Sequence, residues 1–377
     1  MTVPINVLIT RDELMSLGRQ VGGQPTAISP FSKVDSIDTT QRVPSAALVN
    51  AAGRIRADVL PAFNTLVSAQ SLGLVAYSGE NANFEASVYY SVQNATQPAA
   101  LLLSNDGIKL QSPPQITNWV NMLGQFIGES IVKPVEFELE LDNLETWILF
   151  GVIDTVRRQI MKGLAENNNS ESFLLSVKEI AENQKDENLQ WLSAYFAAAN
   201  EFSEVNEAEI LSSMQALAQK GLITFDNTQI TPSEKLIEIA ATFLTLEGHL
   251  RLQASTLDDE NEIANTLIWG VQGRGNALLM WTPDENGVNI FSMSSAQAMI
   301  IIGSLLEAPA SQFTDISLPK ESTPQPVANI PAPTKNIPVA PPKKKRNTLK
   351  IVLVLGGIIL ICVCLAFFAY ALAYGLI

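Results

Sequence analysis

The sequence predicts an α+β protein: two tandem copies of a mixed helix and antiparallel-sheet unit in a pseudo-twofold relation, a Pro-rich linker and a C-terminal transmembrane helix. Three observations predict this class. A strand-like segment that runs into a helical one occurs twice, eight prolines lie between Leu318 and Pro342, and residues 351–377 carry no charge. At 377 residues the chain is long enough for two domains of ordinary size.

The opening segment of each copy supports the duplication. The first copy begins INVLITRDELMSLG at Ile5, and the second begins VEFELELDNLETWILFG at Val135. A shift of 130 residues aligns Asp12 with Asp142 without a gap. Both segments alternate with period two, pass a capping-type residue and continue with helical spacing. We therefore expect one α+β repeat at 4–129 and a second at 134–308.

The later parts of the two copies also correspond. SAQSLGLVAY and LAQKGLITF each indicate a helix that ends in a left-handed glycine cap, with Gly73 aligned to Gly221. AALLLSNDGIKLQ and NALLMWTPDENGVNIF predict hairpins, and QITNWVNMLGQFIG and SAQAMIIIGSLLEA predict closing helices. The offset between the copies grows along the chain, so the second copy must carry insertions. The largest is a helical insertion near 165–205.

The segment at 318–342 lacks a periodic apolar pattern. Its prolines fix many φ angles and favour an extended conformation, which predicts a disordered linker.

The last 27 residues predict a single-pass, tail-anchored protein of the cell membrane. An uncharged apolar run of about 20 residues can cross a bilayer as a helix, so 351–377 is long enough. A basic juxtamembrane segment, 343–350, precedes it, and basic residues stay on the cytoplasmic side. The N-terminal domain is therefore expected in the cytoplasm, with the lipid bilayer as one partner. The residues expected to set the orientation and contact headgroups are Lys343, Lys344, Lys345, Arg346 and Lys350.

Charge and cysteine content exclude several classes of function. Residues 1–321 contain 18 basic and 38 acidic side chains, a net charge of −20. A field of that sign opposes phosphate binding, so no nucleic-acid partner is expected. The two cysteines, Cys362 and Cys364, lie within the apolar run and point in different directions on a helix. They predict neither a disulfide framework nor a zinc site.

No residues match a known catalytic, cofactor or metal motif, so the prediction is that the protein is not an enzyme and has no cofactor. His249 is the one histidine, and a surface or strand-edge position is expected for it. The glycines of GVQGRG (270–275) lack the pattern of a phosphate-binding loop and predict a turn between strands. The acidic stretches at 182–188 and 257–262 lack the spacing of an EF-hand loop.

The pattern of the second copy resembles the EspG family of cytosolic chaperones associated with type VII secretion. The resemblance covers about residues 4–308. It rests on the opening strand with its D-x-L helix, the helix–G-L-I cap, the strand LRLQAS, the hairpin and the closing helix. It implies a pseudo-twofold α+β fold and a non-enzymatic protein that binds helical-hairpin clients. The Pro-rich linker, the apolar tail and the 165–205 insertion depart from the family pattern.

These observations predict a tail-anchored adaptor or chaperone-like protein whose α+β domain binds protein partners, helical secretion clients among them. One alternative is a membrane-tethered winged-helix transcriptional regulator, because the segment from Glu207 to Phe243 has the order of helix, glycine cap, two short strands and helix. Its presumed reading helix has one basic residue, Lys220, beside Glu207 and Glu209, which disfavours DNA binding. A second alternative is an enzyme with an unrecognised site.

Overall fold

The computed structural model describes most of residues 4–308, which belong to one compact unit spanning residues 1–320. The described ranges are 4–32, 46–80, 82–92, 97–104, 106–131, 133–167, 173–200, 207–226, 229–258, 260, 262–284 and 287–308. The predicted linker at 318–342, the basic segment at 343–350 and the predicted span at 351–377 lie outside the described residues.

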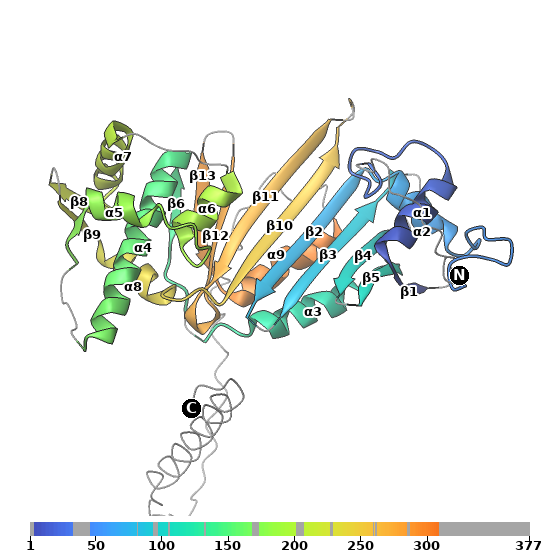
Figure 1. Ribbon diagram of the computed structural model, residues 1–377, viewed down its shortest axis with the longest axis horizontal. Helices are drawn as coiled ribbons and strands as arrows, with labels where there is room; N and C mark the ends of the chain where they lie inside the picture. The colour runs from blue at the N-terminus through green and yellow to red at the C-terminus, as the bar shows by residue number, and fades with distance from the viewer. Residues whose placement is uncertain are drawn as a thin grey trace, which may run out of the picture. The chain divides into compact units, whose positions relative to one another are not determined.

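A ten-stranded antiparallel sheet runs through the described unit in the order β1-β5-β4-β3-β2-β10-β11-β12-β13-β6 (Figure 1). Its first five strands in the chain are β1 (Ile5–Ile9), β2 (Ser71–Gly79), β3 (Asn83–Tyr90), β4 (Ala99–Ser104) and β5 (Gly107–Ser112). The other five are β6 (Glu138–Leu141), β10 (Gly248–Leu257), β11 (Ile263–Gln272), β12 (Leu278–Pro283) and β13 (Val288–Met293). A second, three-stranded sheet has the order β7-β9-β8, with β7 (Leu175–Ser176), β8 (Ile223–Asp226) and β9 (Gln229–Pro232).

The strand order is the same when it is read inward from either edge. Each edge strand, β1 or β6, is followed in the chain by a helix, and each half contributes a meander of four further strands. The two meanders join through the antiparallel pair β2–β10, in which Val75 lies opposite Leu252. The sheet is therefore continuous through both halves of the chain.

The two helices that follow the edge strands are α1 (Arg11–Val21) and α4 (Asn143–Ala165). The capping position aligned at Asp12 and Asp142 is confirmed for Asp142, whereas α1 is capped by Thr10 and Asp12 lies in its first turn. Thr10 accepts a hydrogen bond from the backbone N–H of Glu13 at 3.2 Å, and Asp142 accepts one from Glu145 at 2.7 Å. Each glutamate accepts in return from the backbone N–H of its capping residue, which forms a capping box. These reciprocal bonds fix where both helices start.

One face of the sheet is covered by α3 (Ile116–Ile127) and α9 (Ser295–Glu307), which lie behind the sheet in Figure 1. Alternate residues of the central strands point to this side, so Val75, Leu250 and Leu252 are buried against Trp119 and Leu305. This layer is the core beneath the middle of the sheet.

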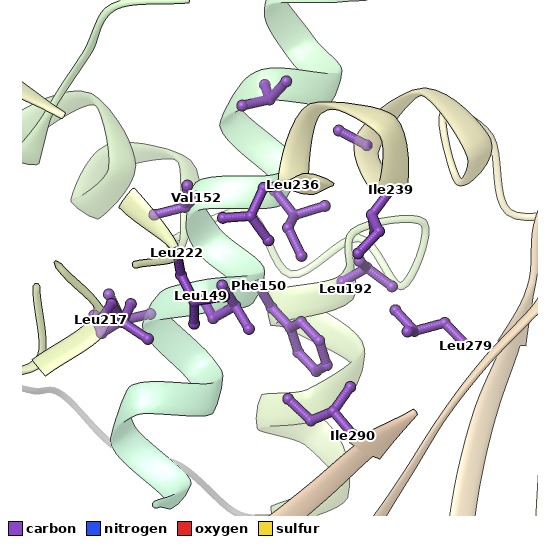
Figure 2. Packing of buried hydrophobic residues seen from close by; sticks show 14 of the residues in the cluster. Leu149, Phe150, Val152, Leu192, Leu217, Leu222, Leu236, Ile239, Leu279 and Ile290 are labelled. Carbon is purple, nitrogen blue, oxygen red and sulfur yellow. The ribbon is translucent and has the colours of Figure 1, made fainter. Parts of the chain in front are cut away.

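The opposite face is covered at its two ends by separate groups of helices (Figure 1). At the β1 end, α1 and α2 (Leu60–Val67) bury Leu14, Leu17, Phe63 and Leu66. At the β6 end, α4 packs with α5 (Val177–Asn183), α6 (Leu192–Asn200), α7 (Glu207–Gln219) and α8 (Glu234–Thr242). Figure 2 shows this second core, in which Phe150 of α4 lies among leucine and isoleucine side chains of α6, α8, β12 and β13.

Several predicted elements are confirmed in place. The hairpins β4–β5 and β12–β13 and the closing helices α3 and α9 lie where the sequence indicates. Gly221 has φ of +72° after α7, and the N–H of Leu222 donates to the carbonyl of Leu217 at 3.0 Å. That bond satisfies an otherwise unpaired carbonyl at the end of the helix, as a left-handed cap does.

The prediction of a matching helix cap at Gly73 is wrong. Helix α2 ends at Val67, and Gly73 lies inside β2. A Cβ atom at Gly73 would lie 2.6 Å from the carbonyl oxygen of Leu305 in α9. Glycine is therefore required by the close approach of a helix backbone to the strand. In the sheet order the counterpart of β2 is β10, so aligning Gly73 with Gly221 mismatches the two copies.

The prediction that the fold includes a transmembrane helix is corrected. No helix in the described part of the chain is both long enough and apolar enough to cross a membrane. Helix α4 is the longest of the described helices at 23 residues, but five of its residues are charged. Charged side chains are costly in hydrocarbon, and α4 packs instead against α5, α6, α7 and α8. The described fold is α+β with a large antiparallel sheet.

Candidate functional site

The middle of the sheet is uncovered on the face opposite α3 and α9. In Figure 1 no described helix crosses the near side of β11, β10, β2 and β3 between the two helical groups. Alternate side chains point to this open face and are exposed or half-buried. We call the following set the central strip: Leu74, Ala76, Ser78, Glu85, Leu103, His249, Arg251, Gln253 and Trp269.

The register of the strands places one row of the central strip across five strands. Trp269 lies opposite Arg251, and Arg251 lies opposite Ala76 on its other side. Ala76 lies opposite Glu85, which in turn faces Leu103. An aromatic, a cationic, a small, an acidic and an aliphatic side chain therefore follow one another on one surface. Neighbouring side chains in such a row lie about 5 Å apart.

Arg251 is the central polar group of this row. Its Nη2 donates to Gln253 Oε1 at 2.7 Å, and the guanidinium carbon lies 5.2 Å from the centre of the Trp269 ring. Its Nε atom is buried and has no hydrogen-bond partner among the described residues. No described carboxylate forms an ion pair with it. Because the side chain is only half-buried and no described carboxylate neutralises it, the guanidinium can pair with a carboxylate or carbonyl group of another molecule.

An aromatic wall borders the strip on the side of α6. Tyr195 of α6 packs edge-to-face on His249 with 4.6 Å between ring centres, and on Trp269 with 5.9 Å. His249 Nε2 lies 3.1 Å from the carbonyl oxygen of Leu189. The histidine is half-buried on the open face of β10, which agrees with the surface position given as one of its two expected places. Its contacts hold the α6 segment beside the sheet.

A polar ladder continues the strip along β10 and β11. Gln253 Nε2 donates to Ser255 Oγ at 2.9 Å, and Ser255 Oγ donates to Asn265 Oδ1 at 2.6 Å. Together with the bond from Arg251 to Gln253, this chain of donors orients the amide of Gln253. The guanidinium is therefore held in place before any partner arrives.

The end of the strip opens into a pocket of about 610 Å³. Tyr195, His249 and Arg251 line it together with Phe126 of α3 and Leu103 of β4. A second pocket of about 780 Å³, lined by the β2–β3 turn and the segment before β10, shares Tyr77, Ser78, Phe126 and His249 with the first. The hollow surface thus reaches from the open sheet face around the end of β2.

Burial raises the pKa of Tyr195 to about 12. A tyrosine that stays neutral in the folded protein, but ionises near pH 10 when unfolded, lowers stability as pH rises from 10 to 12. We expect the difference in tyrosinate absorbance between wild type and Tyr195→Phe to titrate near pH 12 in the folded chain. A difference that titrates near pH 10 would show that Tyr195 is not packed in this wall.

The predicted turn at GVQGRG is confirmed. It connects β11 to β12 through a short 3₁₀ turn (Arg274–Asn276), and Gly275 has φ of +71°. The space around it is filled: Asn276 Nδ2 donates to the carbonyl of Glu129, and Gln272 Nε2 donates to Asn276 Oδ1. The loop therefore serves the packing of α3 against the sheet rather than offering free N–H groups to a phosphate.

The acidic stretches are also structural. Asp186 pairs with Arg158 at 2.7 Å and accepts from Trp191 Nε1 at 2.8 Å, and hydrogen bonding to Arg158 lowers the pKa of Asp186. Asp258 accepts from the backbone N–H groups of Glu260 and Glu262 and closes a turn. Within the described ranges no group of three or more acidic, histidine or cysteine side chains could hold a metal ion.

The anchor residues predicted from the sequence lie outside the described residues, so they are not part of this site: Lys343, Lys344, Lys345, Arg346 and Lys350. The residues that build the site were missed. One signal was present, because HLRLQAS alternates polar and apolar side chains and predicts a strand with two different faces. Nothing local identified Tyr195, which reaches the strip from the helical segment at 192–200.

No protein-family model matches the chain, and no curated protein matches it. Among solved structures it is similar to the type VII secretion system chaperone EspG5 of Mycobacterium tuberculosis, in a complex with a PE25-PPE41 dimer. The two chains are 10% identical with a TM-score of 0.38, and the alignment covers 81% of this chain and 96% of the EspG5 chain. The likeness is weak and shows neither a family nor a partner.

Proposed function

We propose that this chain is a non-enzymatic, chaperone-like adaptor that binds a helical segment of a protein partner on the central strip. The observation that carries the proposal is Arg251, a half-buried cation that forms no ion pair with any described carboxylate and lies on an otherwise uncovered sheet face. The proposal rests on this geometry and takes no support from the likeness to EspG5.

The composition of the strip fits a protein-binding surface. Arginine, tyrosine and tryptophan are enriched among the residues that dominate binding energy at interfaces, and Arg251, Tyr195 and Trp269 lie together here. Leu103 is 49% exposed at the far end of the row. A mixed surface of aromatic, aliphatic and single charged groups is typical of the centre of such a patch.

The shape of the sheet favours a helix as the occupant. The other face of the same strands is covered by two helices, α3 and α9, so the twist of this sheet accepts helices lying across it. An α-helix with side chains is about 10–12 Å wide, which corresponds to two or three neighbouring strands of a sheet. We infer an amphipathic helix whose apolar side meets Leu74, Ala76 and Leu103 and whose carboxylate or helix C-terminus meets Arg251.

The same geometry disfavours catalysis at this place. A histidine that acts as a general base needs a nucleophile and an orienting group on its second nitrogen. His249 Nε2 contacts the carbonyl of Leu189, and the neighbouring Tyr195 stays protonated to about pH 12. Among the described residues no serine, threonine or cysteine side chain is hydrogen-bonded to His249 as a nucleophile would be.

The proposal predicts a site-specific cross-link. A photoreactive benzoylphenylalanine replaces exposed Ser78 in the full-length chain, in the cells that produce it, and a matched probe replaces exposed Asn121 on the outer side of α3. We expect one discrete protein adduct from position 78 and none from position 121. Arg251→Glu should reduce that adduct about tenfold or more, because charge reversal at an interface centre costs over 1.4 kcal/mol.

Two results would contradict the proposed function. Equal adducts from positions 78 and 121 would show contact without a specific surface. An adduct from position 78 that is unchanged by Arg251→Glu would show that the partner does not use the central strip. Circular dichroism of each variant checks that the fold is retained.

A further inference from the structure

We propose that the outer edge of β1 is a strand-pairing surface that joins two copies of this chain into a weak dimer. Among the described strands, β1 pairs with β5 alone, through five consecutive residue pairs without a bulge. No other described strand pairs with the backbone N–H and C=O groups on its other side. An open edge of this kind pairs readily unless the sequence protects it.

The two edges of the sheet are protected very differently. The opposite edge, β6, carries Glu138 and Glu140, whose side chains are both exposed. Lys220, which follows α7, also donates from Nζ to the backbone carbonyl of Glu140 at 3.2 Å. Charges on an edge strand are a common device against unwanted pairing. The edge at β6 is therefore closed to a second copy.

The β1 edge has none of this protection. Its sequence, INVLI, contains no charged residue, no proline and no glycine. Leu8 is 50% exposed, although leucine is costly to leave in water. Lys109 is the residue opposite Leu8, but it belongs to β5, the inner neighbour of β1. It therefore places no charge on the outer edge of β1. An uncharged, regular, apolar edge is suited to pair with another strand.

The sequence of β1 is complementary to itself in one antiparallel register. Centred on Val7, this register places Ile5 of one copy opposite Ile9 of the other and Asn6 opposite Leu8. The residues at 5, 7 and 9 share the side that packs under α1 and α2, so that side would stay apolar across the junction. Because β1 has no charged side chain, no like charges meet in this register. A twofold pairing of this kind closes on itself and does not continue into a filament.

The expected dimer is weak because five-residue strands bury little area. Interfaces below about 1,200 Å² are typical of transient contacts. We infer that the occupant is a second copy of this chain. When β1 pairs with β1, apolar residues meet at positions 5, 7 and 9, and no charged residue is brought into the junction. Pairing at β1 leaves the central strip free, so the two surfaces can be tested separately.

The first test is sedimentation velocity of the full-length chain over a concentration series in one buffer. We expect reversible dimerisation, and we expect Leu8→Glu to raise the dissociation constant about tenfold or more. The matched control is Ile300→Glu, because Ile300 is 60% exposed on α9 and belongs neither to β1 nor to the central strip. Ile300→Glu should leave the dimer unchanged.

A wild-type chain that stays monomeric throughout the series would overturn the proposal. So would a dimer that Leu8→Glu and Ile300→Glu weaken equally.

The second test checks the register in a chain with Cys362 and Cys364 replaced by serine. Directly opposite residues lie close enough for a disulfide. A mixture of Asn6→Cys and Leu8→Cys chains should therefore cross-link to each other, and neither variant should cross-link to itself. Self-linking of Asn6→Cys at the same rate would exclude this register.

Discussion

Asp154→Ala is expected to lower the free energy of unfolding by about 3–5 kcal/mol. Asp154 and Arg157 are both 1% exposed, and their side chains are 2.6 Å apart. Asp154 also accepts hydrogen bonds from the backbone N–H groups of Leu192 and Ser193, which begin α6. The alanine would leave the Arg157 charge buried without its carboxylate and the start of α6 without its acceptor. Chemical denaturation monitored by circular dichroism measures the change.

Two controls isolate the cause. Asp154→Leu combined with Arg157→Met removes both charges, and we expect it to be less destabilising than Asp154→Ala because no buried charge remains. Glu182→Ala removes an exposed pair with Lys178, 3.8 Å apart on α5, and should change stability by less than about 0.5 kcal/mol. An Asp154→Ala chain within about 1 kcal/mol of wild type would show that this pair is not buried as described.

Gly73→Ala is expected to lower the free energy of unfolding by about 1–3 kcal/mol, and by more if α9 cannot shift. The new Cβ would lie 2.6 Å from the carbonyl oxygen of Leu305. Because that oxygen belongs to a helix backbone, a rotamer change cannot relieve the contact. Denaturation of the full-length chain gives the loss, and hydrogen exchange in α9 should rise with it.

Gly303→Ala is the matched control for Gly73→Ala. Gly303 lies in α9 itself, and its Cβ would have Val120 as nearest neighbour at 3.9 Å, an ordinary contact. Alanine is favoured over glycine in a helix by up to about 1 kcal/mol, so this variant should be neutral or stabilised. If both glycine variants lost the same stability, the close approach of α9 to β2 would not be the cause.

Local signals in the sequence predicted much of the fold. The capping residue Asp142, the left-handed turn at Gly221 and both hairpins depend on neighbouring residues, and the structure contains all of them. Such features follow from hydrogen bonds and φ preferences within a few positions. The bounds of the two repeats remain a prediction.

The errors arose where distant contacts decide the local structure. The apolar run around Gly73 fits the end of a helix or a buried strand equally well, and the contact with Leu305 that requires glycine comes from the last described helix. The central strip was beyond prediction for the same reason. The alternation of Leu250, Arg251 and Leu252 indicates two faces, but it does not say which helices leave one face open.

The fold explains how the proposed site depends on both halves of the chain. Ala76 and Glu85 come from the first half, and Arg251 and Trp269 come from the second, so the row forms when β2 pairs with β10. The Asp154–Arg157 pair acts from further away, because it anchors the start of the helix that carries Tyr195. Stability of the α4–α6 contact and the shape of the strip are therefore linked.

The central claim is that one sheet joins the two halves at β2 and β10 and so builds the central strip. Residue-resolved hydrogen exchange of the full-length chain tests it most directly. Strands paired on both sides should exchange nearly all their amides only through large-scale unfolding. We predict this slow exchange throughout residues 72–77 of β2 and 250–255 of β10. Rapid exchange of every second amide in either strand would identify it as a sheet edge and contradict the claim.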